Sequence, residues 1–306
     1  MSSKPEPLIF AVLESFYVGG DLKDVTGLFG PEQQVIGSMY VRRSVPVVRQ
    51  LPLPVVFVHG GMHTGATWET TPDGREGWET LFVRAGIETL VIDQPFRGRS
   101  PPDLNGLNPT VVGYPPAGPA FTCGSYLPRQ FERGGGRFDL SDLSAYLPQL
   151  WPDFFVPHAF AAGKPALSDP RALAAMSALV DRIGRCVIVS HSQGGHLGWQ
   201  TAIARPDKVA AILSIEPGMT EGLDDPEFPQ IPVRIMWGDG LTDQPGVLSN
   251  RDLAAAQALA RSNTAISVDH LPADGIQGNG HMMMMEDNSS ELARRAIDWL
   301  RSLDIH

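Results

Sequence analysis

The sequence predicts an α/β fold with a mostly parallel central sheet flanked by helices. Two observations lead to this prediction. First, five short apolar runs, each followed by a loop and a helical pattern, occupy residues 55–58, 89–92, 187–189, 211–215 and 233–236. Runs of β-branched residues without polar alternation are typical of strands buried on both faces, as in parallel sheets. Second, strands that alternate with helices indicate right-handed crossover connections between neighbouring strands.

Both ends of the chain carry their own patterns. Two strand-like runs, residues 8–18 and 35–45, flank a turn-rich stretch with paired glycines, which predicts an antiparallel start to the sheet. Near the other end, Asn288 followed by Glu291 resembles a capping box and predicts the start of a final helix. The apolar stripe of that helix is Leu292, Ala296, Trp299, Leu300 and Leu303.

The spacing between strands predicts an insertion. A strand–helix–strand unit needs about 30 residues, whereas more than ninety separate Asp93 from Cys186. We therefore expect roughly residues 101–170 to form an inserted cap or lid within a single domain spanning residues 1–306. Nine of the 24 aromatic residues fall within residues 121–160. A solvated linker would be poor in aromatics, so the composition favours a lid packed over something apolar.

Charge and apolar content exclude several classes of partner. The chain has 24 basic and 34 acidic residues and a net charge of −10, without a local cluster of lysine or arginine. We therefore expect it to bind neither nucleic acid nor an anionic membrane surface. No apolar stretch approaches the roughly 20 residues that a spanning helix needs, and the N-terminal residues lack a signal-sequence pattern. The expected location is the cytoplasm.

The candidate nucleophile is Ser192. Residues 190–195 have the sequence Ser-His-Ser-Gln-Gly-Gly, directly after the apolar run 187–189 and directly before a helical pattern at 196–204. A serine on a sharp strand-to-helix turn presents its hydroxyl at the carboxyl edge of the sheet. The usual pattern is Gly-x-Ser-x-Gly; here Ser190 replaces the first glycine and the second is retained.

The same turn supplies one donor of an oxyanion hole. The backbone N–H of Gln193, at the start of the helix, is expected to bind the tetrahedral intermediate. A second N–H is expected from residues 59–62, which have the sequence His-Gly-Gly-Met after the first apolar run. We favour Gly61 as this donor, with Met62 as the next choice, and expect His59 to brace the loop.

The candidate general base is His281, one of eight histidines. It follows a Gly-Asn-Gly segment at residues 278–280, in a loop after the last predicted strand and before the final helix. The order nucleophile, acid, base along the chain places the histidine of a triad in this loop. The other histidines lie beside the nucleophile, in the predicted insertion, in or just beyond the segment at 59–62, at the end of a strand or at the terminus.

Three carboxylates are candidates for the acid of the triad. Glu216 directly follows the apolar run 211–215, at the same sheet edge as Ser192. Asp239 and Asp243 follow the next run, where the acid of most such enzymes lies. We expect Glu216 to be the acid because of its placement at a strand end, and Asp239 and Asp243 remain the alternatives.

Several of these segments resemble the bacterial, Alcaligenes-type esterase group of the α/β-hydrolases. The segments that carry the resemblance are residues 67–75, 98–100, 190–193, 216–218 and 278–284. The resemblance implies the α/β-hydrolase fold, esterase activity without a cofactor, and a homodimer. It also implies a Ser–Glu–His triad at Ser192, Glu216 and His281.

The predicted function is a serine hydrolase that cleaves the carboxylic ester or lactone of a neutral, fairly bulky apolar substrate through an acyl-enzyme. We expect Met62, Met282, Trp151 and Phe154 to contact that substrate. No metal site is expected, because the methionines at 282–285 lack a cysteine–histidine cluster and suit a pocket wall or core. The alternatives are a lactonase or carbon–carbon bond hydrolase with the same triad, or a hydrolase-derived ligand-binding protein.

Overall fold

A computed structural model describes residues 6–27, 30–101, 146, 149, 169–218, 220, 222–241 and 250–305 of the chain. Its strands are β1 (Phe10–Val18), β2 (Asp21–Gly27), β3 (Gly30–Ile36), β4 (Met39–Pro46), β5 (Val55–Val58), β6 (Thr89–Asp93), β7 (Cys186–His191), β8 (Val209–Ile215), β9 (Val233–Trp237) and β10 (Ile266–His270). Its helices are α1 (Ala66–Glu69), α2 (Trp78–Arg84), α6 (Pro170–Ile183), α7 (Gln193–Ala204), α8 (Asn250–Ser262) and α9 (Ser289–Ser302).

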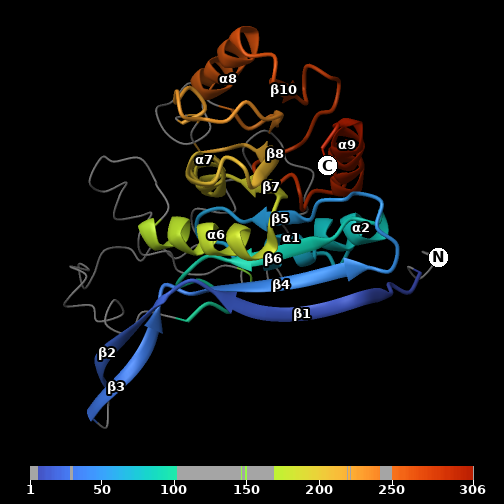
Figure 1. Ribbon diagram of the computed structural model, residues 1–306. Helices are drawn as coiled ribbons and strands as arrows, with labels where there is room; N and C mark the ends of the chain where they lie inside the picture. The colour runs from blue at the N-terminus through green and yellow to red at the C-terminus, as the bar shows by residue number, and fades with distance from the viewer. Residues whose placement is uncertain are drawn as a thin grey trace, which may run out of the picture.

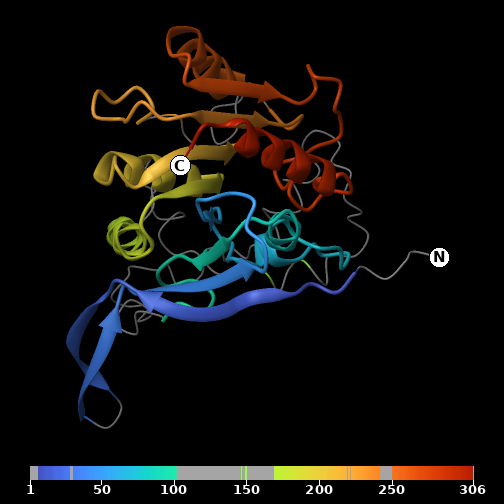
Figure 2. The ribbon, with the colours of Figure 1, turned by 45° about the vertical axis from the view of Figure 1, so that its right-hand side comes forward.

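Eight of the ten strands in this described part form one large sheet, in the order β1-β4-β6-β5-β7-β8-β9-β10. The first two pairings, β1 with β4 and β4 with β6, are antiparallel, and every later pairing is parallel. Figures 1 and 2 show α6 and α7 on one side of the sheet and α2 and α9 on the other. The predicted mostly parallel sheet flanked by helices is therefore confirmed.

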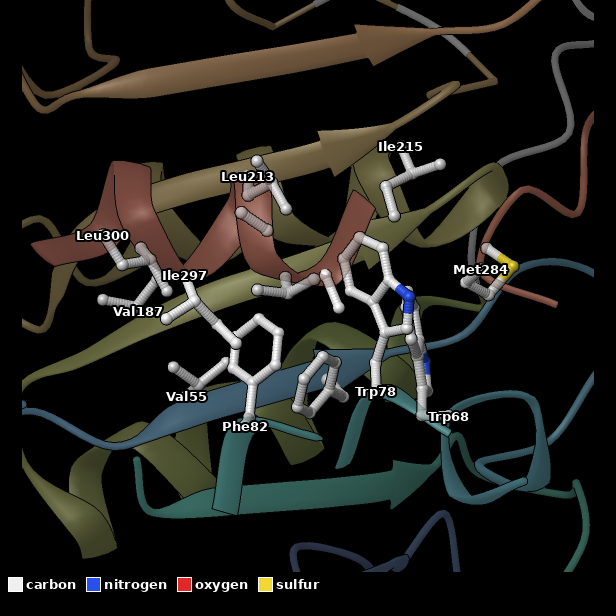
Figure 3. Packing of buried hydrophobic residues seen from close by; sticks show 14 of the residues in the cluster. Val55, Trp68, Trp78, Phe82, Val187, Leu213, Ile215, Met284, Ile297 and Leu300 are labelled. Atoms are coloured by element: carbon white, nitrogen blue, oxygen red, sulfur yellow. The ribbon is translucent and has the colours of Figure 1, made fainter. Parts of the chain in front are cut away.

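Two hydrophobic clusters, one on each face of the sheet, bury the central strands. Side chains alternate between the faces along a strand, so Val55 and Phe57 of β5 enter one cluster while Val56 and Val58 enter the other. Figure 3 shows the first cluster, where Phe82 of α2 lies close to Val55. Burial on both faces explains why these strands are continuous apolar runs.

The N-terminal region differs from its prediction. Residues 35–45 do not form one strand, because Gly37 adopts a φ of +84° between β3 and β4. This left-handed conformation is readily available only to glycine. The turn-rich stretch before it contains β2 and β3, which pair as a separate hairpin that extends away from the main sheet (Figure 1).

The capping box predicted at Asn288 does not form. Asn288 makes no side-chain hydrogen bond to the start of α9. Its amide instead pairs with that of Asn279 through two hydrogen bonds, of 2.7 Å from Asn279 Nδ2 and 3.1 Å from Asn288 Nδ2. Both side chains are buried, so each amide satisfies the other where water cannot.

Almost all of the predicted insertion, including Trp151 and Phe154, lies outside the described residues, as does Asp243. The insertion at roughly 101–170 therefore stays a prediction. Between its two ends, Tyr146 and Gln149 are the described residues. The hydroxyl of the buried Tyr146 lies 2.9 Å from Nε2 of His63, and the Gln149 carbonyl accepts from the Thr64 hydroxyl at 3.4 Å. Both contacts are made with the loop after β5. Of the helices in the described ranges, none has the length and apolar character needed to cross a membrane.

Candidate active site

The turn between β7 and α7 holds Ser192 in a conformation that non-glycine residues rarely adopt. Its backbone has φ +52° and ψ −126°. The Ser192 N–H donates to the Ile215 carbonyl at 3.0 Å, and its own carbonyl accepts from Gly195 at 2.8 Å and from Gly218 at 3.0 Å. Three backbone hydrogen bonds thus hold the strained turn in place. Strain held in this way is characteristic of functional positions.

Small neighbours make room for this turn. A methyl group at Gly194 would lie 2.5 Å from the His59 carbonyl oxygen, so only glycine lets the start of α7 approach the loop after β5. Ser190, which replaces the first glycine of the usual pattern, lies on β7. Its hydroxyl is 2.9 Å from the hydroxyl of Ser214 on β8, and both are buried. The replacement therefore adds a hydrogen bond between strands without blocking the turn.

Glu216 and His281 form a buried hydrogen-bonded pair. Nδ1 of His281 lies 2.7 Å from Oε2 of Glu216, and the two side chains are 2% and 1% exposed. The other carboxylate oxygen, Oε1, accepts the Gly238 N–H at 2.8 Å. Because the carboxylate accepts from Nδ1, the imidazole carries its proton there and leaves Nε2 as the acceptor. Glu216 also has a left-handed backbone, with φ +40°.

Asp239, one of the alternative acids, contacts a different group. Its Oδ2 accepts the Asn279 N–H at 2.9 Å, and its own N–H donates to the Asn279 carbonyl at 2.8 Å. Asp239 thus holds the loop that carries His281 rather than its imidazole ring. Of the two candidate carboxylates that the structure describes, only Glu216 hydrogen bonds to the predicted base.

Two further histidines, neither of them the predicted base, lie in this part of the site: His191 contacts His281, and His63 contacts His191. Nε2 of His191 lies 3.0 Å from the His281 carbonyl, and the two rings are 4.4 Å apart. His63 lies edge-on to His191 at 6.1 Å. Burial lowers the pKa of His191 well below its ordinary value and that of His63 to about 4. Both rings are therefore neutral at pH 7 and place no second positive charge beside the base.

Hydrogen bonds to its carbonyls orient the loop at residues 59–62. Nε2 of His59 accepts the Gln94 N–H at 3.0 Å, so Nδ1 donates to the Gly60 carbonyl at 2.8 Å. This bracing by His59 agrees with the sequence analysis. Burial lowers the pKa of His59 to about 3, which keeps the ring neutral. Nδ1 of His63 likewise donates to the Gly61 carbonyl at 2.7 Å.

The two predicted donors of the oxyanion hole lie in the loop after β5 and at the start of α7. No acceptor within the described ranges takes the Gly61 N–H. Gln193 is the first residue of α7, where a helix offers its N–H groups no internal carbonyl. Met62 is 7% exposed and has φ +59°. These placements support the predicted donors without testing them, so both assignments remain predictions.

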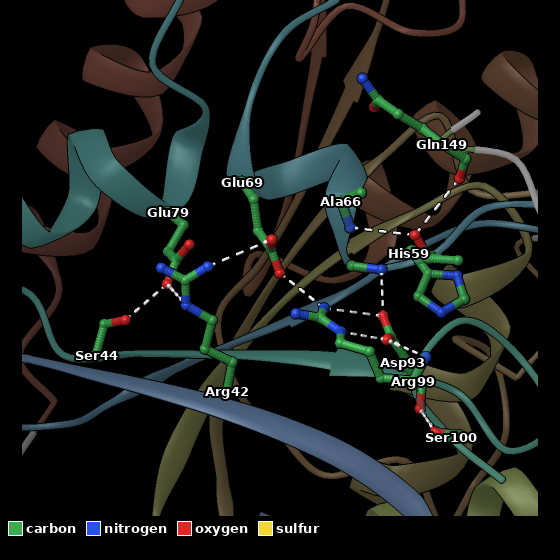
Figure 4. A network of polar contacts seen from close by, with 12 residues as sticks. Arg42, Ser44, His59, Ala66, Glu69, Glu79, Asp93, Arg99, Ser100 and Gln149 are labelled. Atoms are coloured by element: carbon green, nitrogen blue, oxygen red, sulfur yellow. Dashed lines mark hydrogen bonds and ion pairs between the residues drawn. The ribbon is translucent and has the colours of Figure 1, made fainter. Parts of the chain in front are cut away.

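A polar network connects the same loop to the rest of the sheet (Figure 4). Oδ1 of Asp93 accepts the Gly65 N–H at 2.6 Å, and Oδ2 accepts from Nε of Arg99 at 2.6 Å. Arg99 also pairs with Glu69 of α1 at 2.7 Å. Burial raises the pKa of Asp93, but hydrogen bonds from Arg99 outweigh burial and hold it below its ordinary value. The Asp93 carboxylate therefore stays charged and holds the N–H of Gly65 by a hydrogen bond.

The methionine run and residues 67–75 contact one another. All four side chains of residues 282–285 are at most 1% exposed and belong to the cluster around α2 and α9. The Arg75 guanidinium donates to the carbonyls of Met285 at 2.8 Å and Glu286 at 2.9 Å. Substrate contact by Met282, which is fully buried here, stays a prediction. The described ranges hold no group of three or more histidine, cysteine or acidic side chains placed to bind a metal.

Comparisons with known proteins agree with the fold. The model of the alpha/beta hydrolase family matches residues 55–273. The solved structure of a novel bacterial esterase is 30% identical, with 98% of both chains covered and a TM-score of 0.80. The probable secreted lipase phiG of Fungal sp. (strain ATCC 74256) is 26% identical over 95% of this chain and 90% of its own length. A predicted CIB-like hydrolase from Thermoplasma acidophilum shares the fold at 17% identity, with 95% and 99% of the chains covered and a TM-score of 0.51.

Proposed function

The chain belongs to the α/β-hydrolase family, and we propose that it is a serine esterase whose triad is Ser192, Glu216 and His281. One observation carries the proposal: the predicted base and acid lie 2.7 Å apart and buried. The N–H of Ser192, on its strained strand-to-helix turn, donates to the carbonyl of Ile215, the residue before Glu216. The residues follow one another in the order nucleophile, acid, base that is usual for this fold. The chain is an esterase-like hydrolase, because its sequence is 30% identical to that of a bacterial esterase over nearly the whole of both chains.

The proposed reaction is acyl transfer. Nε2 of His281 takes the proton of the Ser192 hydroxyl, whose oxygen attacks the carbonyl carbon of the ester. The N–H groups of Gly61 and Gln193 stabilise the oxyanion, and the alcohol leaves with the proton from His281. Water then attacks the acyl-enzyme by the same route and releases the acid. Glu216 keeps the imidazole in the required tautomer and stabilises its cation.

The proposed substrate is a neutral, fairly bulky apolar ester. The aromatic composition of residues 121–160 supports this choice, because a lid at roughly 101–170 would place such side chains over the site. Met62, Met282, Trp151 and Phe154 remain the predicted contacts. The names of the similar bacterial esterase and the fungal probable lipase favour an ester over other substrates of the same triad.

We also retain two predictions about the state of the protein in the cell. A homodimer is expected, and the edge strand β1 offers apolar surface for one, since Leu13 and Tyr17 are 53% and 52% exposed. Light scattering of the purified protein would measure the mass directly.

A cytoplasmic location is also expected, whereas the fungal relative is named as probably secreted. Fractionation of the cells that produce the protein would decide between the two locations.

The test of the proposed activity is hydrolysis of p-nitrophenyl acetate, butyrate and octanoate by the wild type and by Ser192→Ala. We expect this substitution to lower turnover by about 10⁴- to 10⁶-fold. Ser262→Ala, on the exposed end of α8, is the matched control and should behave as the wild type. A fluorophosphonate should add one phosphonyl group to Ser192, detected by peptide mass spectrometry. Wild-type turnover in Ser192→Ala would refute the triad.

A further inference from the structure

Arg97 joins the two segments that supply the predicted oxyanion donors. It lies in the loop after β6 and is only 6% exposed. Its Nη1 donates to the Gly60 carbonyl at 3.0 Å and to Oε1 of Gln193 at 3.1 Å, and Nη2 donates to the same Oε1 at 3.1 Å. Gly60 precedes one predicted donor, and Gln193 is the other. One guanidinium therefore contacts both halves of the hole.

The bond to Gly60 fixes the direction of the next N–H. The peptide between Gly60 and Gly61 is planar and trans, so its carbonyl and N–H point in opposite directions. Arg97 and His59 both donate to the carbonyl, and the Gly61 N–H is thereby held pointing away from the guanidinium. A donor already aimed at the developing charge needs no reorganisation during the reaction.

The two bonds from Arg97 to Gln193 act on the residue that supplies the second predicted donor. Gln193 is 5% exposed, and its side-chain oxygen accepts from two nitrogens of the same guanidinium. This fork geometry is rigid and available to arginine but not to lysine. Because the side chain of Gln193 is tied to the same group as the Gly60 carbonyl, the start of α7 and the loop after β5 are held at a fixed separation.

Backbone strain independently marks the position of Arg97. In the described part of the chain, four non-glycine residues have a positive φ: Met62, Phe96, Ser192 and Glu216. Three of them belong to the predicted site. The fourth, Phe96, has φ +68° and directly precedes Arg97. Strained residues persist where the surrounding contacts impose them, and they cluster at functional sites.

From these contacts we infer that Arg97 is a positioning residue of the oxyanion hole, which holds the Gly61 and Gln193 N–H groups at the separation that the tetrahedral intermediate requires. The inference rests on the proposed esterase function. Arg97 touches no reacting atom in this role. Its removal should therefore weaken transition-state binding while leaving binding of the uncharged substrate almost unchanged.

The experiment compares Arg97→Met and Arg97→Lys with Arg234→Met. Arg234 is the control because its side chain is also largely buried, and it pairs at 2.7 Å with Asp269 of β10 rather than with a residue of the site. With p-nitrophenyl butyrate, Arg97→Met should lower kcat by about 10²-fold, the loss typical of one oxyanion donor, with little change in KM. Arg97→Lys should recover part of the loss, since an ammonium can reach one acceptor but not both in the same geometry.

A pair of inhibitors separates positioning from simple support of the fold. A trifluoromethyl ketone adds to the serine and forms an oxyanion, whereas the matching methyl ketone binds largely without adding. Arg97→Met should weaken the first inhibitor by the same factor as kcat/KM and leave the second unchanged. In Arg97→Ala, millimolar guanidinium chloride should restore part of the lost turnover, and should have no such effect on the wild type or Arg234→Met.

Equal losses of affinity for the two ketones would overturn the inference, and so would wild-type kcat in Arg97→Met. If Arg97→Met does not fold, two other measurements provide the same test. One is the ratio of the affinities of Arg97→Lys for the two ketones, and the other is the turnover that guanidinium chloride restores in Arg97→Ala. Failure of the proposed function would look different. In that case the wild type would neither hydrolyse the ester nor take up the fluorophosphonate at Ser192, which would overturn both proposals.

Discussion

Two loops meet at the candidate site, and burial contributes more to holding one of them than the other. The loop at residues 59–65 is held by polar side chains that hydrogen bond to its backbone: His59 and Arg97 to the Gly60 carbonyl, and Asp93 to the Gly65 N–H. The loop at residues 278–288 contains four buried methionines, and its backbone carbonyls accept from Arg75. Polar side chains bond to the backbone of both loops, since Asp239 accepts the Asn279 N–H and His191 donates to the His281 carbonyl. The second loop adds the burial of four consecutive apolar side chains.

The difference follows from what each loop must present. An N–H direction is determined by the plane of its peptide, and only a hydrogen bond to the carbonyl of that peptide holds it firmly. An imidazole ring needs a defined place, which close packing provides, and one hydrogen bond to orient it. We therefore expect polar substitutions around the first loop to affect turnover, and substitutions around the second to affect stability unless they remove that one bond.

The largest effect should come from the single bond that orients His281. Glu216→Gln keeps the shape of the side chain but removes the charge that selects the tautomer, and should lower kcat by about 10⁴-fold. Asp239→Asn retains an acceptor for the Asn279 N–H and should stay within about threefold of the wild type. Steady-state hydrolysis of p-nitrophenyl butyrate measures both. A large loss in Asp239→Asn with a small one in Glu216→Gln would reverse the assignment of the acid.

A smaller effect, on stability, is expected from Arg75→Met. The substitution leaves the carbonyls of Met285 and Glu286 without their donor, and each unsatisfied group costs about 1–3 kcal/mol. Urea denaturation should show a loss of about 2–4 kcal/mol in the free energy of unfolding, with nearly wild-type turnover well below the midpoint. Arg84→Met is the control, since its exposed pair with Glu76 contributes about 1 kcal/mol or less. Normal stability with strongly reduced turnover would show that the Arg75 bonds orient this loop rather than stabilise it.

The smallest effect concerns the neutral histidine that donates to the Gly61 carbonyl. The pKa of His63 is lowered to about 4 in the folded protein, so between that value and about 6.5 the unfolded chain binds one more proton. The free energy of unfolding should therefore fall by about 1.4 kcal/mol per pH unit below pH 6.5 from this residue, and its contribution is fully present above that pH. Urea titrations at pH 7, 6 and 5 should show a shallower pH dependence in His63→Gln. An unchanged slope would mean that His63 is already protonated.

Much of the fold could be predicted because its signals are local. Burial on both faces makes each central strand a continuous apolar run, and the nucleophile turn needs small residues within a few positions of Ser192. The confirmed resemblance to bacterial esterases depends on such short segments. The break at Gly37 and the pairing of Asn288 with Asn279 depend on what lies opposite in space, and the local patterns there suggested other structures.

The residues of the site could be predicted only in part, for the same reason. The sequence left Glu216, Asp239 and Asp243 as candidate acids, because strand ends that share one sheet edge are equivalent until the side chains are placed. Arg97, His63 and His191 form no motif with the residues that they contact, and two of the three were considered only as candidate bases. A deeply buried arginine close to two glycines is recognisable only once the loops are assembled.

The contacts that complete the site join parts of the chain that are synthesised far apart in time. Arg97 and Gln193 are 96 positions apart, and Arg75 reaches a carbonyl 211 positions further along. Such distant contacts form late, after the loops between them have closed. The loop at residues 278–288 packs in one cluster with α9, so its methionines cannot be buried until that helix has docked. Recovered esterase turnover would therefore report completion of the whole fold, whereas helical content would report only its early stages.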